Sequence, residues 1–532
     1  MTDGSTSFKV IIVGAGVTGL TLAHCLVKAN IDYALLDKGI VAPNFGTTIT
    51  LQPHGCRILH QLGCLDAVMA TCDVMGGAQC RDPSGKIFAS NDFFGVVRKL
   101  SVQCYHRLAS RQVSHDVEDK LAIVFLRKLY EKLPDHSKVH DKARVEEIIE
   151  EYSKTRVILA DGREFVGDVV VGADGVHSKV REIMWDTANA ANPGMITVEE
   201  KRAMVTQYNA IVMASSPVPG LGSHDMEVTS NDKFSFLLLC QPDWISIIVH
   251  NKLPEEQHCT WPTRRRYTES DMEALASKIS EYPVTETVVF GELWKRRLKA
   301  QMISLEEGVL KNWFFGRIVL AGDAAHKVTP NSALGGNTAM EDAVTLANTI
   351  HALLGTHSNK KPSDVELRDA MRDKYQNARV DRARAIVKVG GDLTRQQAYD
   401  GWKAYFVQRW LTPIVGLDTL AKNIAGLCVT APKLTYVDFD EKRGILGWQD
   451  TLSAVREREV REEDERLKSE PSWGDLNGGF ESVFPQVLSI LVASWLAICV
   501  FHIVFSRQSI PGFGREIWQT VEKENGTFGL AA

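Results

Sequence analysis

Short, nearly continuous apolar runs recur along the chain and predict buried strands. A strand that is covered on both faces shows such a run because side chains on both of its faces are buried. The runs are Phe8–Val13, Tyr33–Leu36, Asp168–Val171 and Arg317–Ala321. Helical spacing follows the first run over Leu20–Ala29 and resumes after the last run from Thr338. This alternation predicts an α/β fold with a parallel sheet.

Two further patterns mark the rest of the chain. Residues 187–300 contain alternating apolar and polar segments such as Lys233–Leu239 and Trp244–Val249, which predict an antiparallel sheet. From Ala343 to Val389 the pattern is helical, and Pro362–Arg372 interrupts it with a surface turn and a new helix start. The chain is therefore expected to insert an antiparallel sheet into the α/β part and to end in helices.

The first strand runs into a glycine-rich turn. Gly14, Gly16 and Gly19 form a GxGxxG motif between strand and helix, and Asp37 closes the second strand eighteen residues after Gly19. The first glycine allows a tight turn, the second lets the backbone approach a pyrophosphate, and the third lets the helix pack on the strand. Asp37 would hold an adenosine ribose. The alternative is a plain βαβ turn whose glycines serve packing.

The strand at Arg317–Ala321 leads into a second candidate site. Asp323 follows it directly, a loop with Pro330 comes next, and Gly335, Gly336 and Asn337 open a helix. The carboxylate can accept hydrogen bonds from a polyol, and a helix N-terminus stabilises an anion. A flavin offers both groups, in its ribityl chain and its reduced ring. By itself the segment also fits any strand–loop–helix connection.

A third motif, Gly172–Ser178 with Asp174, followed by Arg181, lies between these two. In this order the three motifs resemble the single-component FAD monooxygenases built like para-hydroxybenzoate hydroxylase (group A), over about residues 8 to 450. A narrower resemblance is to fungal epoxidases of meroterpenoid and indole-diterpene pathways, of the paxilline type. It is carried by Leu293-Trp294, Leu305–Val309, Trp313, Gly316-Arg317, Leu133–Val139, Ser216–Leu221, Thr260–Pro262 and Gly447-Trp448.

The resemblance implies the chemistry and further site residues. FAD would be reduced by transiently bound NAD(P)H and would react with O2, and its C4a-hydroperoxide would transfer oxygen to an alkene. Asp323 would hold the ribityl chain, while Gly335, Gly336 and Asn337 would offer amides to the flavin's N1–O2 edge. Asp174, Gly46 and Arg111 would also contact FAD. Tyr208 would be catalytic; the alternative is a strand tyrosine with its ring in the core.

Three departures from the family pattern stand out. Asp37 replaces the usual glutamate, and Asn331–Leu334 replaces a more glycine-rich loop, in which Ala333 cannot take a positive φ cheaply. Arg111 lies about ten residues too far from the Leu-Tyr pair that follows it in the family. Val113–Phe125 therefore looks inserted, next to a helix expected to line the FAD site.

Composition narrows the function classes. The 532 residues suffice for two packed domains and a tail, and a net charge of −5 gives no electrostatic case for nucleic-acid binding. Ten cysteines form no CxxC pair, which predicts free thiols in a reducing compartment. His326-Lys327 beside Asp323 offers no second ligand at a usable spacing, so we expect no metal site.

The C-terminal part predicts a membrane anchor. After the mixed-charge run Arg456–Lys468, Val487–Phe505 is nineteen residues without a formal charge, enough to cross a bilayer. The alternatives are a buried core helix, or one that re-enters or lies in the interface, since the flanking cations place the tail in the cytosol. Because FAD and NADPH are supplied in the cytosol, we expect the catalytic part on the cytosolic face, at the endoplasmic reticulum.

The expected layout is a Rossmann-like FAD-binding domain in two parts, 1–186 and 301–355, around a substrate domain at 187–300. A helical region (356–454), a charged linker (455–486), the membrane helix (487–505) and a tail (506–532) follow. The expected function is epoxidation of a hydrophobic prenylated molecule before a terpene cyclase acts. Two alternatives stay open: an aromatic-ring hydroxylase of the same fold, and a membrane-tethered flavoprotein without turnover.

Overall fold

The structure is a computed structural model of the full chain, and it describes residues 8–42, 49–73, 75–101, 107–109, 124–357, 361–442 and 444–450. The chain divides into two compact units, Met1–Glu457 and Arg458–Ala532, and the second lies outside the described residues. In the described ranges, no helix is long and apolar enough to cross a membrane. The predicted anchor Val487–Phe505 lies outside these ranges, as do the linker and the tail.

The four apolar runs form the centre of one sheet, as predicted. Its order is β19-β20-β12-β1-β2-β8, and β1 pairs in parallel with β2 and β12, which pairs in parallel with β20. The residues of β1, β2, β12 and β20 are almost all buried, which explains the unbroken apolar runs. The strands are β1 (Lys9–Val13), β2 (Asp32–Leu36), β8 (Val139–His140), β12 (Val169–Gly172), β19 (Phe314–Phe315) and β20 (Ile318–Leu320).

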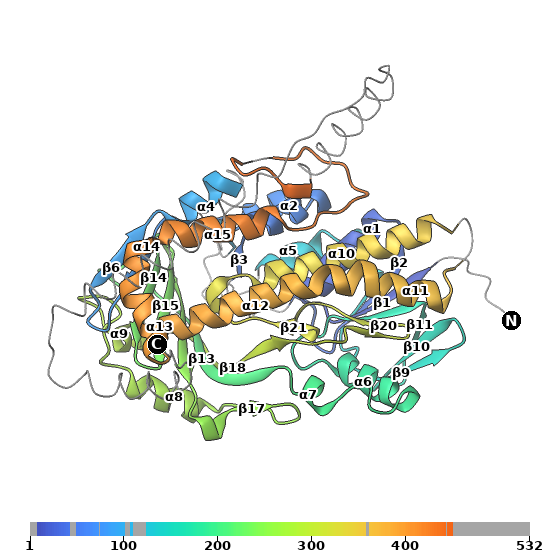
Figure 1. The fold of residues 1–532 in the computed structure, drawn as a ribbon, viewed down its shortest axis with the longest axis horizontal. Helices are drawn as coiled ribbons and strands as arrows, with labels where there is room; N and C mark the ends of the chain where they lie inside the picture. The colour runs from blue at the N-terminus through green and yellow to red at the C-terminus, as the bar shows by residue number, and fades with distance from the viewer. Residues whose placement is uncertain are drawn as a thin grey trace, which may run out of the picture. The chain divides into compact units, whose positions relative to one another are not determined.

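Different layers cover the two faces of this sheet. Helices α1 (Val17–Lys28) and α10 (Gly335–Gly355) pack together on one face, and α6 (Lys179–Ala191) contacts β12 and β20 from the other (Figure 1). A small antiparallel sheet beside α6 consists of β9 (Val145–Glu151), β10 (Lys154–Leu159) and β11 (Glu164–Gly167). The α1 and α10 boundaries place the glycine motif and the Gly335–Asn337 segment at helix N-termini.

The antiparallel sheet is larger than the sequence range 187–300 suggested. Its order is β21-β18-β13-β16-β15-β14-β5-β6, and β17 pairs with β13. Strands β5 and β6 come from before the range, and β5 pairs in parallel with β14. At the other side of the sheet, β18 and β21 extend beyond the range. The strands are β5 (Ala78–Arg81), β6 (Ile87–Asn91), β13 (Val205–Ser215), β14 (Met226–Asn231), β15 (Phe234–Cys240), β16 (Ile245–Lys252), β17 (Cys259–Thr260), β18 (Arg297–Val309) and β21 (His326–Lys327).

Helices from distant parts of the chain close the space between the two large sheets. Helix α4 (Phe93–Ser101) packs against α15 (Leu417–Val429), more than 300 residues later (Figure 1). Helix α12 (Asn377–Gln397) continues, after a short turn, into α13 (Trp402–Phe406), the π-helix η7 (Val407–Leu411) and α14 (Thr412–Val415). The predicted interruption of the helical pattern is confirmed, since α10 ends at Gly355 and a capping box at Ser363 starts α11 (Asp364–Ala370).

The remaining elements are short. Strands β3 (Ile49–Leu51), β4 (Cys72–Asp73) and β7 (Arg107–Ala109) form a small sheet. The other helices are α2 (Pro53–Leu62), α3 (Leu65–Met69), α5 (Val124–Glu131), α7 (Val198–Lys201), α8 (Glu269–Lys278) and α9 (Phe290–Lys295), with the π-helix η6 (Met371–Gln376) between α11 and α12 and 3-10 turns η2 (His136–Lys138), η3 (Glu255–Gln257), η4 (Gly322–Ala324) and η5 (Pro330–Ser332).

Candidate active site

The glycine turn after β1 is built by close backbone packing. Gly14 has φ +106°, and a Cβ there would lie 2.3 Å from the carbonyl oxygen of Ala173. A Cβ on Gly19 would lie 1.8 Å from the carbonyl oxygen of Gly14. Gly16 differs, because a Cβ there would meet no atom within 4 Å and the residue lines a cavity. The turn therefore opens toward this cavity at Gly16, where a ligand can approach the backbone.

The amides at the start of α1 point their positive end toward the same space. The first hydrogen bond of the helix runs from the Leu20 N–H to the Gly16 carbonyl. The amides before Leu20 have no carbonyl partner within the helix, and two of these residues, Val17 and Thr18, line the cavity. Such a helix start favours a phosphate group.

Asp37 lies beside this turn at the end of β2. Its Oδ2 accepts the Ala15 N–H at 2.7 Å, and its Oδ1 accepts the Gly39 N–H at 2.8 Å. A carboxylate has about four lone-pair sites, so acceptor capacity remains for a hydroxyl group. The two backbone bonds fix the carboxylate next to the glycine turn, and Asp37 itself is not among the residues that line the cavity. Its contact with a ribose stays a prediction.

Asp323 lies in the turn after β20 and lines the cavity. It forms an ion pair with Lys327 on β21, and the charge of Asp323 raises the pKa of Lys327 against the opposing effect of burial. The turn is held from below by Asp342 on α10, whose Oδ2 accepts the Gly322 N–H at 2.8 Å and contacts His326 Nε2 at 2.7 Å. His326 thus holds the loop against α10. Among the described residues, no three His, Cys, Asp or Glu side chains form a group that could hold a metal ion.

The N-terminus of α10 faces the cavity through Gly335 and Gly336. The first intrahelical bond joins the Thr338 N–H to the Leu334 carbonyl, so the amides of Gly335, Gly336 and Asn337 precede the helix ladder. The preceding Ala333 adopts φ +53°, the left-handed conformation that an alanine takes only at a cost. The loop geometry expected for a glycine is therefore kept despite the substitution.

The Asn337 side chain has a structural task that the sequence did not indicate. Its amide Nδ2 donates to the Thr50 carbonyl at 2.9 Å, and its Oδ1 accepts the Gln52 N–H at 3.0 Å. These bonds tie the start of α10 to the segment between β3 and α2. Only the backbone amide of Asn337 remains for a ligand.

A largely buried charge network connects α10 with α12. Arg379 on α12 pairs with Glu341 and Asp342, and Arg382 also pairs with Glu341. Burial opposes ionisation of Glu341, but the two arginines outweigh it and lower its pKa to about 2. Burial lowers the pKa of the neighbouring His54 to about 4. The network fixes α10 and α12, which carry two walls of the cavity.

The Asp174 carboxylate forms hydrogen bonds with the start of α6. It accepts the Ser178 hydroxyl at 2.5 Å and the Lys179 N–H at 2.7 Å. Burial raises the pKa of this carboxyl. Ala173 and Gly175 line the cavity, while Asp174 is not among its lining residues. The motif thus offers its backbone to the cavity and uses its carboxylate to cap α6.

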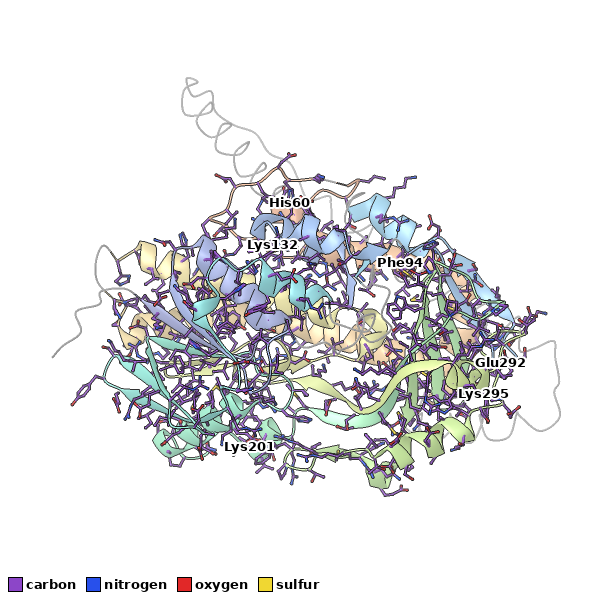
Figure 2. All side chains as sticks on the ribbon, turned by 180° about the vertical axis from the view of Figure 1, so that it is seen from behind. His60, Phe94, Lys132, Lys201, Glu292 and Lys295 are labelled. Carbon is purple, nitrogen blue, oxygen red and sulfur yellow. The ribbon has the colours of Figure 1, made fainter. Side chains whose placement is uncertain are left out.

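The cavity itself has a volume of about 1180 Å³, and its lining includes residues from the loops of the parallel sheet and from strands of the larger sheet. One part is formed by the glycine turn, Asp323 and the start of α10. The other part is apolar, and Figure 2 shows Phe94 on the side of α4 that faces the larger sheet. Its walls come from α4, the larger sheet and the C-terminal helices; they include Phe93, Phe94, Val228, Leu237, Leu239, Ile248, Leu393, Leu417, Leu420 and Ile424.

Tyr208 on β13 lies outside the lining of this cavity. Its side chain is 1% exposed, and its hydroxyl donates to Asp400 Oδ2 at 2.6 Å. Asp400 also pairs with Lys252 on the neighbouring strand. The phenol therefore belongs to a polar cluster between β13 and the end of α12, a geometry that favours the packing role over the catalytic one.

Two other predicted residues, Gly46 and Arg111, lie outside the described residues, as does most of the Val113–Phe125 segment. The end of that segment starts α5, where Phe125 is buried and lines the cavity. Sequence reasoning missed Gln52, Phe94 and the α15 wall. They come from three distant segments without a motif, so local spacing offered no signal for them.

Comparison with known proteins shows the family to which the chain belongs. Residues 7–388 match the FAD binding domain family. The FAD-dependent monooxygenase DEP2 of Alternaria brassicicola is 74% identical over 535 residues, covering 99% of both chains. The chain belongs to the family of FAD-dependent monooxygenases. The namesake DEP2 of Fusarium langsethiae is 77% identical over 516 residues, covering 96% of this chain and 97% of that one.

More distant comparisons agree with this membership. The FAD-dependent monooxygenase penE of Penicillium thymicola is 34% identical over 79% of this chain and 86% of its own. Among solved structures, Klebsiella pneumoniae HpxO complexed with FAD and uric acid has a TM-score of 0.62 at 18% identity, covering 80% of this chain and 97% of that one. This last likeness shows the shared fold.

The residues present fit FAD. Gly16 leaves open space at a helix start, and the Asp37 carboxylate accepts the neighbouring Ala15 N–H. Asp323, Gly335 and Gly336 line the same cavity as Gly16. Two buried polar atoms in this cavity lining, Gln52 Oε1 and Ser332 Oγ, have no hydrogen-bond partner among the described residues. Buried polar groups are normally paired, so these atoms indicate a polar ligand.

Proposed function

We propose that this FAD-binding protein is an NAD(P)H-consuming monooxygenase that epoxidises an alkene of a prenylated, meroterpenoid or indole-diterpene type intermediate. The monooxygenase part is supported by relatives of that name at 74% and 77% identity. The substrate part is supported by one observation, the apolar half of the cavity. The proposed reaction converts the alkene, O2, NAD(P)H and a proton into the epoxide, water and NAD(P)+.

The cavity has a polar part and an apolar part. Pockets for one small ligand are typically about 300–1,000 Å³, and this cavity of about 1180 Å³ is larger. The motif-lined part suits a dinucleotide, and the apolar part suits a hydrocarbon chain. Aromatic and aliphatic walls bind such a chain by removing its surface from water.

The chain's own groups have separate tasks in this reaction. When bound, FAD supplies the activation of O2. Asp37 and the α1 amides would hold the adenosine half, and Asp323 and the α10 amides would hold the ribityl and ring half. Phe93, Phe94 and their apolar neighbours orient the alkene and exclude water, which protects a reactive oxygen donor from hydrolysis.

An aromatic-ring hydroxylase of the same fold is the second candidate. It is favoured by Arg265 and Arg266, which line the cavity and would pair with an anionic aromatic substrate. Arg265 already donates to the Gln257 carbonyl at 3.2 Å, which occupies part of its guanidinium. The third possibility, a tethered flavoprotein without turnover, depends on the Val113–Phe125 segment.

Product analysis separates these functions. The protein is co-expressed with a prenylated phenol or indole precursor under 18O2, and the products are identified by mass spectrometry. We expect a gain of one labelled oxygen and acid-labile opening to a diol. Oxygen on the aromatic ring would support the hydroxylase. FAD binding without any oxygenated product across prenylated and aromatic precursors would support the flavoprotein, and absence of bound flavin would overturn the whole assignment.

The proposal includes a cellular place. The Val487–Phe505 segment would anchor the enzyme at a cytosol-facing membrane of the endoplasmic reticulum, where a terpene cyclase would take the epoxide. A prenylated substrate is poorly soluble in water, so anchoring would raise its local concentration. Cell fractionation tests the anchor: recovery of the full chain in the soluble fraction without detergent would contradict it.

A further inference from the structure

A continuous helical stretch near the end of the described chain exposes an apolar face. The stretch comprises α13, η7 and α14, from Trp402 to Val415. Trp402 is 68% exposed and Ile414 is 75% exposed, although such side chains are usually covered. We call the exposed set the aromatic face; it consists of Trp402, Tyr405, Phe406, Trp410, Leu411, Ile414 and Val415.

The spacing places the aromatic face on one side of the helical stretch. Trp402, Phe406, Trp410 and Ile414 follow one another at intervals of four residues, and residues at this spacing are neighbours on a helix surface. The opposite side contacts the protein, where Gln408 is buried. A contiguous apolar surface of this kind marks a contact site.

The chemistry of the aromatic face fits the surface of a lipid bilayer. Tryptophan and tyrosine are enriched where hydrocarbon meets headgroups, because their rings are apolar and carry one polar edge. Lys403 and Arg409 stand beside the two tryptophans, with Lys403 Nζ 5.6 Å from the Trp402 ring centre and the Arg409 guanidinium 5.3 Å from that of Trp410.

The charges around the aromatic face agree with an anionic lipid surface. Residues 401–423 carry the three cations Lys403, Arg409 and Lys422 and the single acid Asp418, within a chain of net charge −5. One of the cations, Arg409, also lies 3.9 Å from Asp82. Apolar residues flanked by cations are the pattern of helices that lie in the interface plane.

The aromatic face is continuous with the cavity. Leu411 and Val415 belong to both, since each is exposed and each lines the cavity wall. From Val415 the chain passes directly into α15, whose Leu417 and Leu420 line the apolar part of the cavity. Figure 1 shows α13 and α14 at the end of the described body that also holds α15 and the larger sheet.

We propose that the aromatic face docks on the surface of a phospholipid bilayer and that the cavity opens toward it. An apolar substrate dissolved in the bilayer would then pass along Leu411 and Val415 into the cavity without crossing water. This contact is independent of the Val487–Phe505 segment. It also does not depend on which oxidation the enzyme performs.

Hydrogen–deuterium exchange of the full-length, FAD-loaded protein tests the proposal. Exchange is followed with and without vesicles of phosphatidylcholine and phosphatidylserine, and peptides from residues 401–423 are compared with the rest of the chain. We expect vesicles to slow exchange in these peptides, and more so when phosphatidylserine is present. Protection confined to the 487–505 region, or none at all, would overturn the proposal.

Variants sharpen the test. The triple variant Trp402→Ser/Trp410→Ser/Ile414→Ser touches no residue of the cavity lining and is expected to lower the vesicle affinity of this segment at least about ten-fold. Tyr152→Asn, which removes a fully exposed aromatic ring at the β9–β10 turn, is the control and should change nothing. Flavin absorbance shows whether each variant is folded.

A milder variant keeps the test decisive if the triple variant fails to fold. Lys403→Glu/Lys422→Glu changes only exposed charges and should remove the extra protection by phosphatidylserine. Equal protection by both vesicle types in this variant and in the wild type would contradict the role of the cations. Protection that grows with protein concentration in the absence of vesicles would assign the aromatic face to a second copy of the chain and overturn the lipid proposal.

Discussion

At the residue scale, variants of Asp323 and Lys327 can show whether Asp323 binds the ligand or only stabilises its loop. Both line the cavity and they pair with each other. If Asp323 holds the ribityl chain, Asp323→Ala should weaken FAD binding at least about ten-fold, as loss of a charged hydrogen-bond acceptor does. Lys327→Met removes the same ion pair and should retain FAD. Titration of the apoprotein with FAD measures both, and equal losses would reduce Asp323 to a loop-stabilising role.

A Tyr208 variant can likewise distinguish a packing role from a catalytic role. Its buried hydroxyl donates to Asp400, and Tyr208 is not one of the residues that line the cavity. We therefore expect Tyr208→Phe to keep FAD and turnover and to lower the free energy of unfolding by about 1 kcal/mol. Product formation and thermal unfolding are measured side by side. Loss of product with normal stability and bound FAD would restore the catalytic role that the resemblance implied.

Buried histidines predict the pH dependence of stability. Burial lowers the pKa of His54 to about 4 and that of His250 to about 3, from 6.5. Below pH 6.5 the unfolded chain binds protons at these positions that the folded chain excludes, so stability falls as the pH drops toward 4. The slope is up to about 1.4 kcal/mol per pH unit for each histidine.

His250→Leu should reduce this slope by the contribution of one proton. Neither ring nitrogen of His250 has a hydrogen-bond partner among the described residues, so no partner should be left unpaired by the substitution. Urea unfolding between pH 4.5 and 7.5 gives the slope directly. His224→Asn, which replaces an exposed histidine, is the control for the loss of a histidine as such. An unaltered slope in His250→Leu would show that His250 is protonated in the folded state.

At the element scale, the Asn337 side chain ties the start of α10 to the segment between β3 and α2. Asn337→Ala would leave the buried Thr50 carbonyl and Gln52 N–H unpaired, at a cost of about 1–3 kcal/mol for each group. Because α10 would lose its tie to the β3–α2 segment, FAD affinity should fall together with the melting temperature.

The matched control lies on the same helix. Asn348 donates to the Lys433 carbonyl at 2.8 Å, far along α10 from the cavity. Asn348→Ala should lower the melting temperature and leave FAD affinity unchanged. If both variants lose FAD equally, general destabilisation of the helix explains the effect.

At the scale of the whole molecule, FAD binding should be independent of the C-terminal unit. The family match ends at residue 388, and the first compact unit ends at Glu457. A chain that ends after Glu457 should bind FAD with unchanged affinity and fractionate without detergent more readily than the full chain. Flavin absorbance and sedimentation check both points. Loss of FAD on truncation would show that the C-terminal unit completes the fold.

The parallel strands, their helices and the FAD motifs were readable from the sequence. Each depends on local rules: unbroken apolar runs for strands buried on both faces, and glycines where a Cβ would meet backbone atoms, as at Gly14 and Gly19. The interruption before α11 was equally local, because a capping box at Ser363 starts that helix. Such signals lie within about twenty residues, so a single sequence suffices to find them.

Tertiary structure decided what local signals cannot reach. The apolar cavity wall joins α4, the larger sheet and α15, and its members are hydrophobic residues that any core would contain. The family resemblance implied a catalytic role for Tyr208, while the structure pairs its hydroxyl with Asp400, which is 192 residues away. Asp174 was expected to contact FAD, which stays a prediction, and the structure shows its carboxylate accepting the Lys179 N–H at the start of α6. The sequence determines which chemical group each residue carries, while the partner that this group contacts depends on long-range packing.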